Sequence, residues 1–378
     1  MDDKKLFKQV EYFENRVIKN KKHLLKWAKR NGVFCFRLYD KDIPEIPLCV
    51  DLYYEAPAAE GGEPFAKPFA VLTLYKRPYE KDAAEELQWL KAMQAVLERV
   101  FDIGDEAVFI KLRQKRSAAF EKRNAVYAQR EKRITVQEGS AYFYIYFGEL
   151  LDTGLFLDHR WLRRRIFETA HGKRVLNLFC YTGAFSVFAA LAGAERVVSV
   201  DLSKNYLQRA KDNFSLNGLD IRETDFIAQD VFSFLKTATA ERSERRFKTY
   251  SEKFKTLRSE QGRIRKNVGE KGFDIIVCDA PTFSNSKKTV TVLDINRDWF
   301  ELCDLCLALL TADGVLYFSC NSKTIKIKPP VLAEFAQSFF EKTGKAVSVR
   351  DITAASLDED FRNKKPHILL ELRFVKNH

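Results

Sequence analysis

Acidic side chains stand directly after several short apolar runs of this sequence. The first run, RVLNLF, leads into the loop CYTGA (180–184), and the next two runs end in Asp201 and Asp230. A fourth run ends in Asp279, which is followed by a proline turn. In an open α/β sheet the carboxyl ends of parallel strands share one edge, and ligands bind there. The order of these acids therefore predicts a ligand site at such an edge.

The loop after the first run is too bulky for a dinucleotide. Of the pattern G-x-G-x-x-G only Gly183 remains, because larger side chains stand where small residues are needed. These larger residues are Asn177, Phe179 and Tyr181. Such a loop crowds out a pyrophosphate but admits a nucleoside without phosphates, and S-adenosylmethionine is such a ligand.

The acids of the second and third runs suit the same ligand. Asp201, 18 residues after Gly183, can accept both ribose hydroxyl protons, and Asp230 is placed to meet the adenine amino group. The alternative, in which both acids only cap helices, explains each acid by itself but not the ordered set. We therefore predict an S-adenosylmethionine site.

The stretch CDAPTFSNSKK (278–288) follows the fourth run, beside the methionine end of such a cofactor. Asp279 and the turn at Pro281 would present backbone carbonyls to a flat substrate, and Phe283 an aromatic wall. A base extruded from RNA can stack on such a wall while its edge meets polar atoms. These three residues are the predicted catalytic group.

The chain resembles the bacterial large-subunit ribosomal RNA guanine-N7 methyltransferases in the stretches DAPTFSNSKK, LNLFCYTGAFS, LDTGLFLDHR and FENRVIKNKKHLLKWAKRNGVFCFRLYD. The resemblance extends from about Phe13 to Phe374. It implies a class I methyltransferase fold, S-adenosylmethionine as donor, and N7 of a guanosine in 23S ribosomal RNA as acceptor. In many bacteria this enzyme is the C-terminal half of a fused protein whose other half methylates guanine N2. No such half is visible, so the resemblance implies a stand-alone version.

The resemblance also implies roles for residues that match its motifs. Asp158 and Arg160 of TGLFLDHR are implied to approach the methionine part of the cofactor. The predicted cofactor-binding set is Asp158, Arg160, Asn177, Phe179, Tyr181, Thr182, Gly183, Asp201, Asp230 and Asp279. The implied acceptor-side loop is Asp279, Pro281, Thr282 and Phe283.

Guanine N7 carries a lone pair and no proton, so its methylation needs no general base. Catalysis is then mostly in-line positioning and desolvation of two reactants. His159, within the TGLFLDHR motif, is accordingly interpreted as a packing or hydrogen-bonding residue.

Cys320 keeps a second reaction open, because it stands where the family pattern has asparagine. Cytosine-C5 methyltransferases place a nucleophilic cysteine at this strand end, since C5 reacts only after a thiolate has added to C6. Lys287 and Lys323 would lower the pKa of such a thiol. The alternative function is therefore a ribosomal RNA cytosine-C5 methyltransferase. In the simpler interpretation Cys320 is a small buried residue.

Short apolar runs alternate with helical segments from about residue 160 onward. The seven runs are RVLNLF, RVVSVD, TDFIAQD, FDIIVCD, GVLYFSC, AVSVRDIT and HILLELRFV. This alternation predicts an α/β fold with a doubly wound, seven-stranded and mostly parallel sheet. The last two runs are joined by a segment with little helical pattern, so we expect the final strand to enter antiparallel at the sheet edge.

The first part of the chain has a different pattern. Apolar residues recur at helical spacing over residues 4–30, and strand-like runs and a second helical pattern follow. We predict a small α+β RNA-binding domain at residues 1–105 and a basic linker with a β-hairpin at 106–150. A class I methyltransferase domain at 151–378 follows, with a basic insert at 237–272.

Three segments hold more than the whole net charge of +12. Lys and Arg outnumber Asp and Glu by ten to four in residues 1–30, nine to two in 111–133, and eleven to five in 237–272. Clustered positive charge is typical of proteins that bind a polyanion, whereas a single cluster is more often a solvated helix face. Three clusters favour nucleic acid, and the predicted partner is 23S ribosomal RNA or a large-subunit assembly intermediate.

Composition limits the other classes of protein. No run of 18 or more apolar residues is present, and the N-terminal residues have no apolar signal region. The seven cysteines show no disulfide spacing. Cys303 and Cys306 fall in an apolar helical pattern, where core packing is favoured over zinc. We therefore expect a cytoplasmic, monomeric enzyme without a metal or a membrane partner.

Overall fold

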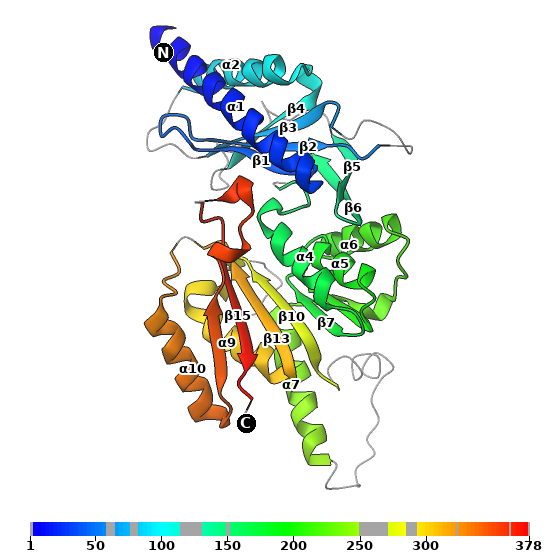
Figure 1. Ribbon diagram of the computed structural model, residues 1–378. Helices are drawn as coiled ribbons and strands as arrows, with labels where there is room; N and C mark the ends of the chain where they lie inside the picture. Colours follow the sequence, from blue (N-terminus) through cyan, green and yellow to red (C-terminus); the bar gives the residue numbers. More distant parts are fainter. Residues whose placement is uncertain are drawn as a thin grey trace. The chain divides into compact units, whose positions relative to one another are not determined.

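The computed structural model describes residues 3–57, 65–75, 82–113, 131–148, 152–248, 271–284, 293–322, 324–362 and 364–376 (Figure 1). The chain forms two compact units. Unit 1 consists of Met1–Leu157 and Asp358–Arg362, and unit 2 consists of Asp158–Leu357 and Asn363–His378. The chain therefore passes from one unit to the other three times.

Unit 1 is built on a four-stranded sheet in the order β1-β2-β3-β4. Its strands are β1 (Cys35–Asp40), β2 (Leu48–Tyr54), β3 (Pro68–Tyr75) and β4 (Val108–Arg113). Neighbouring strands among the first three are antiparallel, whereas β4 is parallel to β3. The parallel pair is possible because helix α2 (Ala83–Phe101) returns the chain between these strands.

Helices α1 (Asp3–Asn31) and α2 form a core with this sheet. α1 buries Phe13 and Val17, and α2 buries Trp89 and Met93, at intervals of about one helical turn. The indole N–H of Trp89 donates a hydrogen bond to Oε1 of Gln9 at 2.8 Å, which ties the two helices together. The helix predicted over residues 4–30 is therefore present as α1, in a unit that contains both helices and strands.

A β-hairpin of β5 (Lys132–Glu138) and β6 (Ala141–Phe147) follows in unit 1, as predicted. Phe147 stacks on Phe109 of β4, with ring centroids 4.4 Å apart. The segment 106–150, which the sequence sets apart, therefore contributes β4 to the sheet of residues 1–105 and the hairpin to the same unit. The structure divides the chain after Leu157.

Unit 1 also includes the short segment Asp358–Arg362 from near the end of the chain. The backbone N–H of Arg37 donates to Oδ2 of Asp360 at 3.1 Å. The Arg37 guanidinium lies over the ring of Phe361, 5.1 Å from its centroid. These contacts attach the segment to β1.

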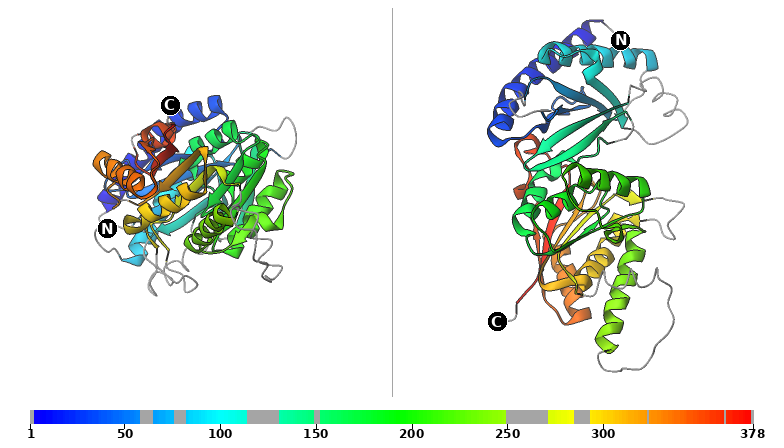
Figure 2. Two further views of the ribbon diagram at one scale, coloured as in Figure 1. Left: turned by 90° about the horizontal axis from the view of Figure 1, so that it is seen from below. Right: turned by 90° about the vertical axis from the view of Figure 1, so that its right-hand side faces the viewer.

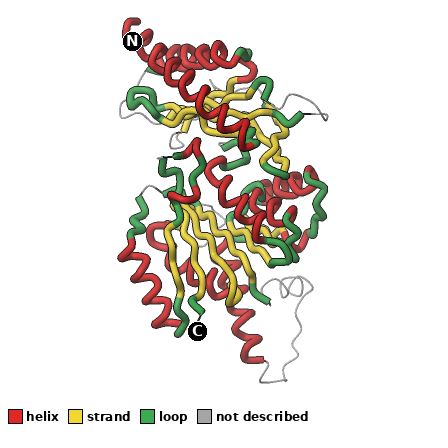
Figure 3. The backbone as a smooth tube through the Cα atoms, viewed as in Figure 1, coloured by secondary structure: helices red, strands yellow, loops and turns green. Residues whose placement is uncertain are grey.

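Unit 2 contains a seven-stranded sheet in the order β14-β15-β13-β10-β7-β8-β9, in which the strands lie side by side (Figure 3). The strands are β7 (Arg174–Leu178), β8 (Arg196–Asp201), β9 (Phe226–Ala228), β10 (Phe273–Ala280), β13 (Leu310–Cys320), β14 (Val347–Asp351) and β15 (Ile368–Phe374). They coincide with the seven predicted runs, so the α/β fold class is confirmed.

Helices cover both faces of this sheet (Figure 2). α4 (Arg160–Thr169) and α5 (Ala184–Leu191) pack on one face, and α6 (Lys204–Leu216) packs beside α5. α7 (Val231–Lys248), α9 (Ile295–Leu309) and α10 (Pro329–Thr343) pack on the other face. The sheet is therefore doubly wound.

The final strand β15 is antiparallel to its neighbours, as predicted, but the prediction that it lies at the sheet edge is wrong. β15 lies between β13 and β14, and β14 forms the edge. Burial explains this order. Leu369–Leu372 of β15 are all buried, whereas β14 alternates with polar, exposed Ser348 and Arg350. A strand with charged side chains suits an edge, where it also discourages pairing with another chain.

The predicted basic insert begins as a continuation of α7, which extends to Lys248. Arg242 on this helix donates from Nη1 to the carbonyl oxygen of Ala308 at 3.0 Å. Residues 249–270 lie outside the described part of the chain.

All seven cysteines are free and buried, and Cys303 and Cys306 lie in the core on α9, as predicted. Among the described residues, no helix has both the length and the apolar character that a membrane span requires.

Candidate functional site

The register of the parallel strands brings the predicted acids to one edge of the sheet in unit 2. Leu178 of β7 is paired with Val200 of β8 on one side and with Cys278 of β10 on the other. Asp201 and Asp279, each one residue further along, therefore follow at the same level. The edge continues to Ser319 of β13, which pairs with Asp279.

Asp201 holds the loop between β7 and α5. Its Oδ2 accepts a hydrogen bond from the backbone N–H of Tyr181 at 3.0 Å, and its Oδ1 accepts one from Ser203 at 2.8 Å. Burial raises the pKa of the Asp201 carboxyl, while these backbone N–H groups oppose the rise. The carboxylate is therefore placed at the turn of the loop, where the sequence predicts the ribose contact.

This loop has a strained backbone. Phe179 and Tyr181 have φ values of 53° and 51°, in the left-handed region that non-glycine residues seldom adopt. Gly183 follows with a φ of 74°. Two bulky left-handed residues and a single glycine leave no glycine cradle for a pyrophosphate, and this arrangement fits a nucleoside cofactor without phosphates.

Gly183 also allows α5 and α6 to approach closely. A Cβ atom at this position would lie 2.7 Å from Cβ of Ala210, closer than two carbon atoms can pack. The preceding carbonyl, of Thr182, accepts a hydrogen bond from the side-chain amide of Asn213 on α6 at 2.9 Å. Helix α6 therefore contacts this loop at both Thr182 and Gly183.

Asp230 caps helix α7. Its Oδ1 accepts hydrogen bonds from the backbone N–H and the hydroxyl of Ser233, both at 2.9 Å. The helix-capping interpretation therefore describes the contact that Asp230 makes, and it occupies one of the two carboxylate oxygens. An adenine contact through the other oxygen stays a prediction.

Asn177 lies inside the sheet and not on its edge. Its side chain is fully buried, and its amide donates to Oγ of Ser186 at 2.9 Å. Ser186 in turn lies 2.8 Å from Oγ of Ser199. Oδ1 of Asn177 has no partner among the described residues. Asn177 thus orients α5 against β7 and β8 from beneath the predicted cofactor loop.

The acceptor-side loop begins at the end of β10. Asp279 and Pro281 are half-buried, and the hydroxyl of Thr282 donates to Oδ1 of Asn321 at 2.8 Å, which joins the ends of β10 and β13. Phe283 and Ser284 form the short strand β11, paired with β12 (Leu293–Asp294). Residues 285–292 of the predicted loop lie outside the described residues.

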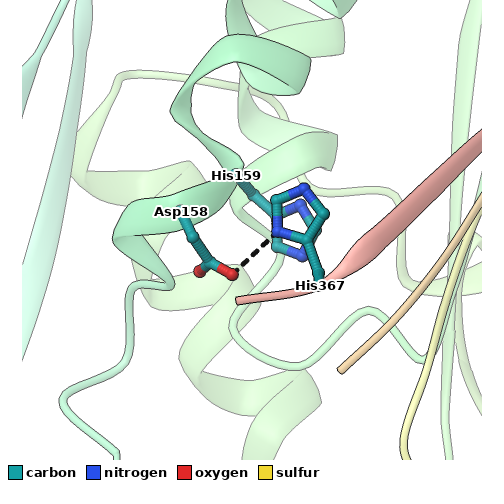
Figure 4. A group of neighbouring side chains, drawn as sticks. All are labelled: Asp158, His159 and His367. Carbon is teal, nitrogen blue, oxygen red and sulfur yellow. Dashed lines mark hydrogen bonds and ion pairs between the residues drawn. The ribbon is translucent and has the colours of Figure 1, made fainter. Parts of the chain in front are cut away.

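Two histidines stack against each other at this edge (Figure 4). The rings of His159 and His367 have centroids 4.3 Å apart and are inclined by 19°. Nδ1 of His367 lies 2.9 Å from Oδ2 of Asp158, and Nε2 of His159 lies 3.3 Å from Oδ1 of Asp279. The stack thereby connects the two acids that the sequence assigns to the donor and acceptor ends of the site.

The His159–Asp279 pair favours its ionised form. Burial of the ring disfavours the imidazolium, but Asp279 and Asp158 outweigh burial and raise the pKa of His159. Burial likewise disfavours the charged form of Asp279, but His159 outweighs it and lowers the pKa of that carboxyl. A histidine committed to this ion pair is a positioning group, in agreement with the interpretation that it is not a base.

Asp158, His159 and His367 bring candidate ligand atoms within 4.8 Å of one another, so a metal must be considered. A metal requires lone pairs that converge on one point. In the nearly parallel rings the in-plane lone pairs point along separate planes. Nε2 of His367 also has its own partner, Oγ of Ser356 at 3.2 Å. The geometry fits a hydrogen-bonded stack, and an enzyme without a metal stays a prediction.

Cys320 ends β13 and is fully buried. Burial raises the pKa of its thiol to about 11, the N–H of Ser322 opposes the rise, and Asp279 adds to it. Such a thiol is almost entirely protonated at neutral pH and is a poor nucleophile. Lys287 and Lys323, its predicted activators, lie outside the described residues.

Arg160 follows the histidine at the first residue of α4 and is buried. The sequence did not single out His367, Ser356 or Asn213 as part of the site. His367 had one visible signal: it opens the last apolar run, although it is far in sequence from the motif of Asp158.

Two models of protein families match the chain. The model described as S-adenosylmethionine-dependent methyltransferase matches residues 68–240. The model described as FtsJ-like methyltransferase matches residues 159–342. Both matches include the loop from β7 to α5 and the end of β8.

Curated relatives are similar over most of the chain. Ribosomal RNA large subunit methyltransferase K of Neisseria meningitidis serogroup B is 38% identical over 361 residues, which are 96% of this chain and 86% of that protein. Ribosomal RNA large subunit methyltransferase K/L of Chromohalobacter salexigens is 36% identical over 94% of this chain. The chain spans only 41% of the length of that second relative.

Solved structures share the fold. A crystal structure described as a methyltransferase complexed with SAH has a TM-score of 0.66 and 21% identity, and the alignment covers 97% of this chain and 82% of that one. A SAM-dependent methyltransferase from Streptococcus mutans has the same TM-score at 20% identity, with 97% and 81% covered. At this identity the likeness bears on the fold alone.

Proposed function

The chain belongs to the ribosomal RNA large subunit methyltransferase K family of S-adenosylmethionine-dependent methyltransferases, and from this membership we propose that it methylates N7 of a guanine in 23S ribosomal RNA. The name of the Neisseria relative supports large-subunit ribosomal RNA as the acceptor. The resemblance of the acceptor-side loop to guanine-N7 enzymes supports the choice of base and atom.

The observation that carries this proposal is the state of Cys320. Methylation of cytosine C5 requires a thiolate, whereas Cys320 is fully buried with a pKa raised by burial to about 11. Methylation of guanine N7 requires neither a thiolate nor a base. A site whose histidine is paired with Asp279 and whose cysteine is protonated therefore supports N7 chemistry.

The residues of the chain act in this proposal by positioning. S-adenosylmethionine supplies a methyl group on a positively charged sulfur. Asp201 would accept hydrogen bonds from the ribose hydroxyls, and the loop that it holds would support the rest of the nucleoside. Asp279 and the turn at Pro281 would orient the guanine so that its N7 lone pair attacks the methyl carbon in line. Orientation and exclusion of water supply the rate enhancement.

The test is methylation of unmodified 23S ribosomal RNA with S-adenosylmethionine, followed by borohydride and aniline. N7-methylation labilises the glycosidic bond, so the treated strand is cut at the modified guanine. Primer extension then maps the cut. Methyl incorporation without any cut would contradict the N7 proposal.

Substitution of Cys320 separates the two reactions. With N7 as the acceptor, we expect Cys320→Ser and Cys320→Asn to retain most of the methyl transfer, because the thiol has no covalent role. With C5 as the acceptor, either change removes the nucleophile and costs several orders of magnitude. A covalent complex between the wild-type protein and 5-fluorocytosine RNA would support C5 and overturn the first choice.

We also propose that the acceptor is 23S ribosomal RNA itself or a large-subunit assembly intermediate, and that the enzyme acts as a monomer in the cytoplasm. The three basic segments support an RNA partner. Sedimentation with and without large-subunit RNA would measure both the oligomeric state and the partner.

A further inference from the structure

Unit 1 has a groove along α1 that is separate from the residues of the methyl-transfer site. One face of α1 lines the groove, and Ile43, Glu45 and Ile46 from the connection between β1 and β2 line its other side. Its volume is about 790 Å³. We call it the α1 groove.

The spacing of residues on α1 builds the groove wall. Lys5, Lys8, Tyr12 and Lys19 follow one another at intervals of one or two helical turns, so they share one face. The next face of the helix is buried in the core, and Gln9, between the two faces, is bonded to Trp89. The wall is therefore attached to the core through the buried face of α1 and through Gln9.

The α1 groove is strongly positive. Five basic residues line it against a single acidic one, Glu45, and the basic residues are Lys4, Lys5, Lys8, Arg16 and Lys19. Lys5, Lys8 and Lys19 are exposed. From Lys5 to Lys19 the helix rises by about 21 Å at roughly 1.5 Å per residue. A wall of this length presents positive charge to several successive phosphates of one strand.

An aromatic side chain stands in the middle of this positive wall. Tyr12 is 54% exposed and lines the groove between Lys8 and Lys19. Proteins that bind single-stranded nucleic acid combine a basic track for the backbone with aromatic rings on which unpaired bases stack. A duplex keeps its bases stacked inside and offers none to such a ring.

We propose that the α1 groove binds a single-stranded RNA segment, with Lys5, Lys8 and Lys19 on its phosphates and Tyr12 against a base. This proposal rests on the proposed function, because it names the surface by which that same RNA substrate is held. It commits to an unpaired segment of the RNA and not to a duplex.

The first experiment compares two triple variants of the full chain. Lys5→Gln/Lys8→Gln/Lys19→Gln removes charge in the groove. Lys91→Gln/Lys173→Gln/Lys345→Gln removes three exposed charges that lie outside α1. Fluorescence anisotropy measures binding of labelled single-stranded RNA of about 12 nucleotides, a length within the range of known single-strand sites, over a series of salt concentrations.

We expect the groove variant to lower the logarithmic salt slope by about 2, or roughly 0.7 for each phosphate that the lysines no longer neutralise. The variant outside the groove should keep the wild-type slope. Equal effects of both variants, or no effect of the first, would overturn the proposal. So would preferential binding of a duplex, or equal competition by polyglutamate, which would indicate a site for any polyanion.

The second experiment tests the base contact. Tyr12→Phe keeps the ring and should bind single-stranded RNA like the wild type, whereas Tyr12→Ala should weaken binding by about tenfold with an unchanged salt slope. Equal binding by both variants would remove Tyr12 from the site. Methyl transfer to 23S RNA, measured in parallel, distinguishes failure of the α1 groove from failure of the proposed function. If the wild type methylates RNA and the groove variants bind RNA as the wild type does, only the α1 groove is refuted.

Discussion

Asp201 holds the strained loop of the predicted cofactor site and also offers the carboxylate expected to meet the ribose. We expect Asp201→Ala to weaken S-adenosylmethionine binding at least tenfold, since a hydrogen bond to a charged group contributes about 1.5–3 kcal/mol. Titration calorimetry measures this loss. Asp201→Asn, which keeps one acceptor oxygen for the loop, should be closer to the wild type in melting temperature than in affinity. An unchanged dissociation constant in Asp201→Ala would remove this residue from the site.

The pair of His159 and Asp279 makes the stability of the protein depend on pH. The folded-state pKa of His159 is raised, so its contribution is complete below the unfolded value of about 6.5 and is lost as pH rises through the folded value. The pKa of Asp279 is lowered, so its contribution is present above about 3.9 and is lost as pH falls through the folded value. The pair therefore contributes most to the free energy of unfolding between about pH 3.9 and pH 6.5.

We expect His159→Gln to remove the alkaline part of this dependence. Urea unfolding at a series of pH values should show that the wild type loses free energy of unfolding as pH rises from about 6.5, whereas the variant loses less. Parallel curves for the two proteins would mean that the histidine carries no such charge.

The types of the site residues were readable from the sequence, but their partners were not. Asp158 and Asp279 stand in recognisable motifs, and the structure brings both to the same histidine stack. His367 belongs to that stack through a contact between residues far apart in the chain, and periodicity carries no information about such contacts. For Asp230 the capping alternative describes the observed contact, because a short acid before a helix satisfies its first N–H groups.

At the scale of elements, Gly183 sets the distance between α5 and α6. We expect Gly183→Ala to cost about 1–2 kcal/mol for the left-handed backbone and about 1–3 kcal/mol more for the clash with Ala210. Gly218→Ala is the matched control, because Gly218 has a φ of 64° and nothing within 4 Å of an added Cβ. Urea unfolding of both variants separates the backbone cost from the clash. Equal losses of unfolding free energy in the two variants would show that α6 shifts to accommodate the added Cβ.

The strands of unit 2 were predictable because each is a short apolar run between helical segments. The order of the strands in the sheet was harder to predict, as the position of β15 shows. Both β14 and β15 follow the same helix, and the choice of which one pairs with β13 depends on contacts between distant runs. The greater apolarity of β15 was the available signal that it would be enclosed on both sides.

At the scale of the whole molecule, unit 1 includes Asp358–Arg362 from near the other end of the chain. We expect Phe361→Ala to destabilise unit 1 by about 3–5 kcal/mol, because this side chain is 2% exposed and lies against Arg37. Phe340→Ala, at a residue that is 49% exposed, should cost less than about 0.5 kcal/mol. Hydrogen exchange in peptides from β1 measures whether Asp358–Arg362 protects the strand that it contacts. Unchanged protection of β1 in Phe361→Ala would contradict this dependence.

The sequence predicted that the methyltransferase domain begins at residue 151, and the structure divides the chain after Leu157. Residues 106–150 contain a strong basic run, which resembles a linker, yet they supply β4, the edge strand that pairs with β3. The contribution of residues 358–362 was invisible, because five residues without a regular pattern carry no sign of the unit to which they attach.

The interleaved path of the chain has a consequence for inheritance. A recombination event that joins the coding sequence for residues 1–157 to a new catalytic partner transfers unit 1 without the five residues that complete it. A successful exchange must carry two separate stretches of the gene, or the new partner must provide its own substitute for Asp360 and Phe361.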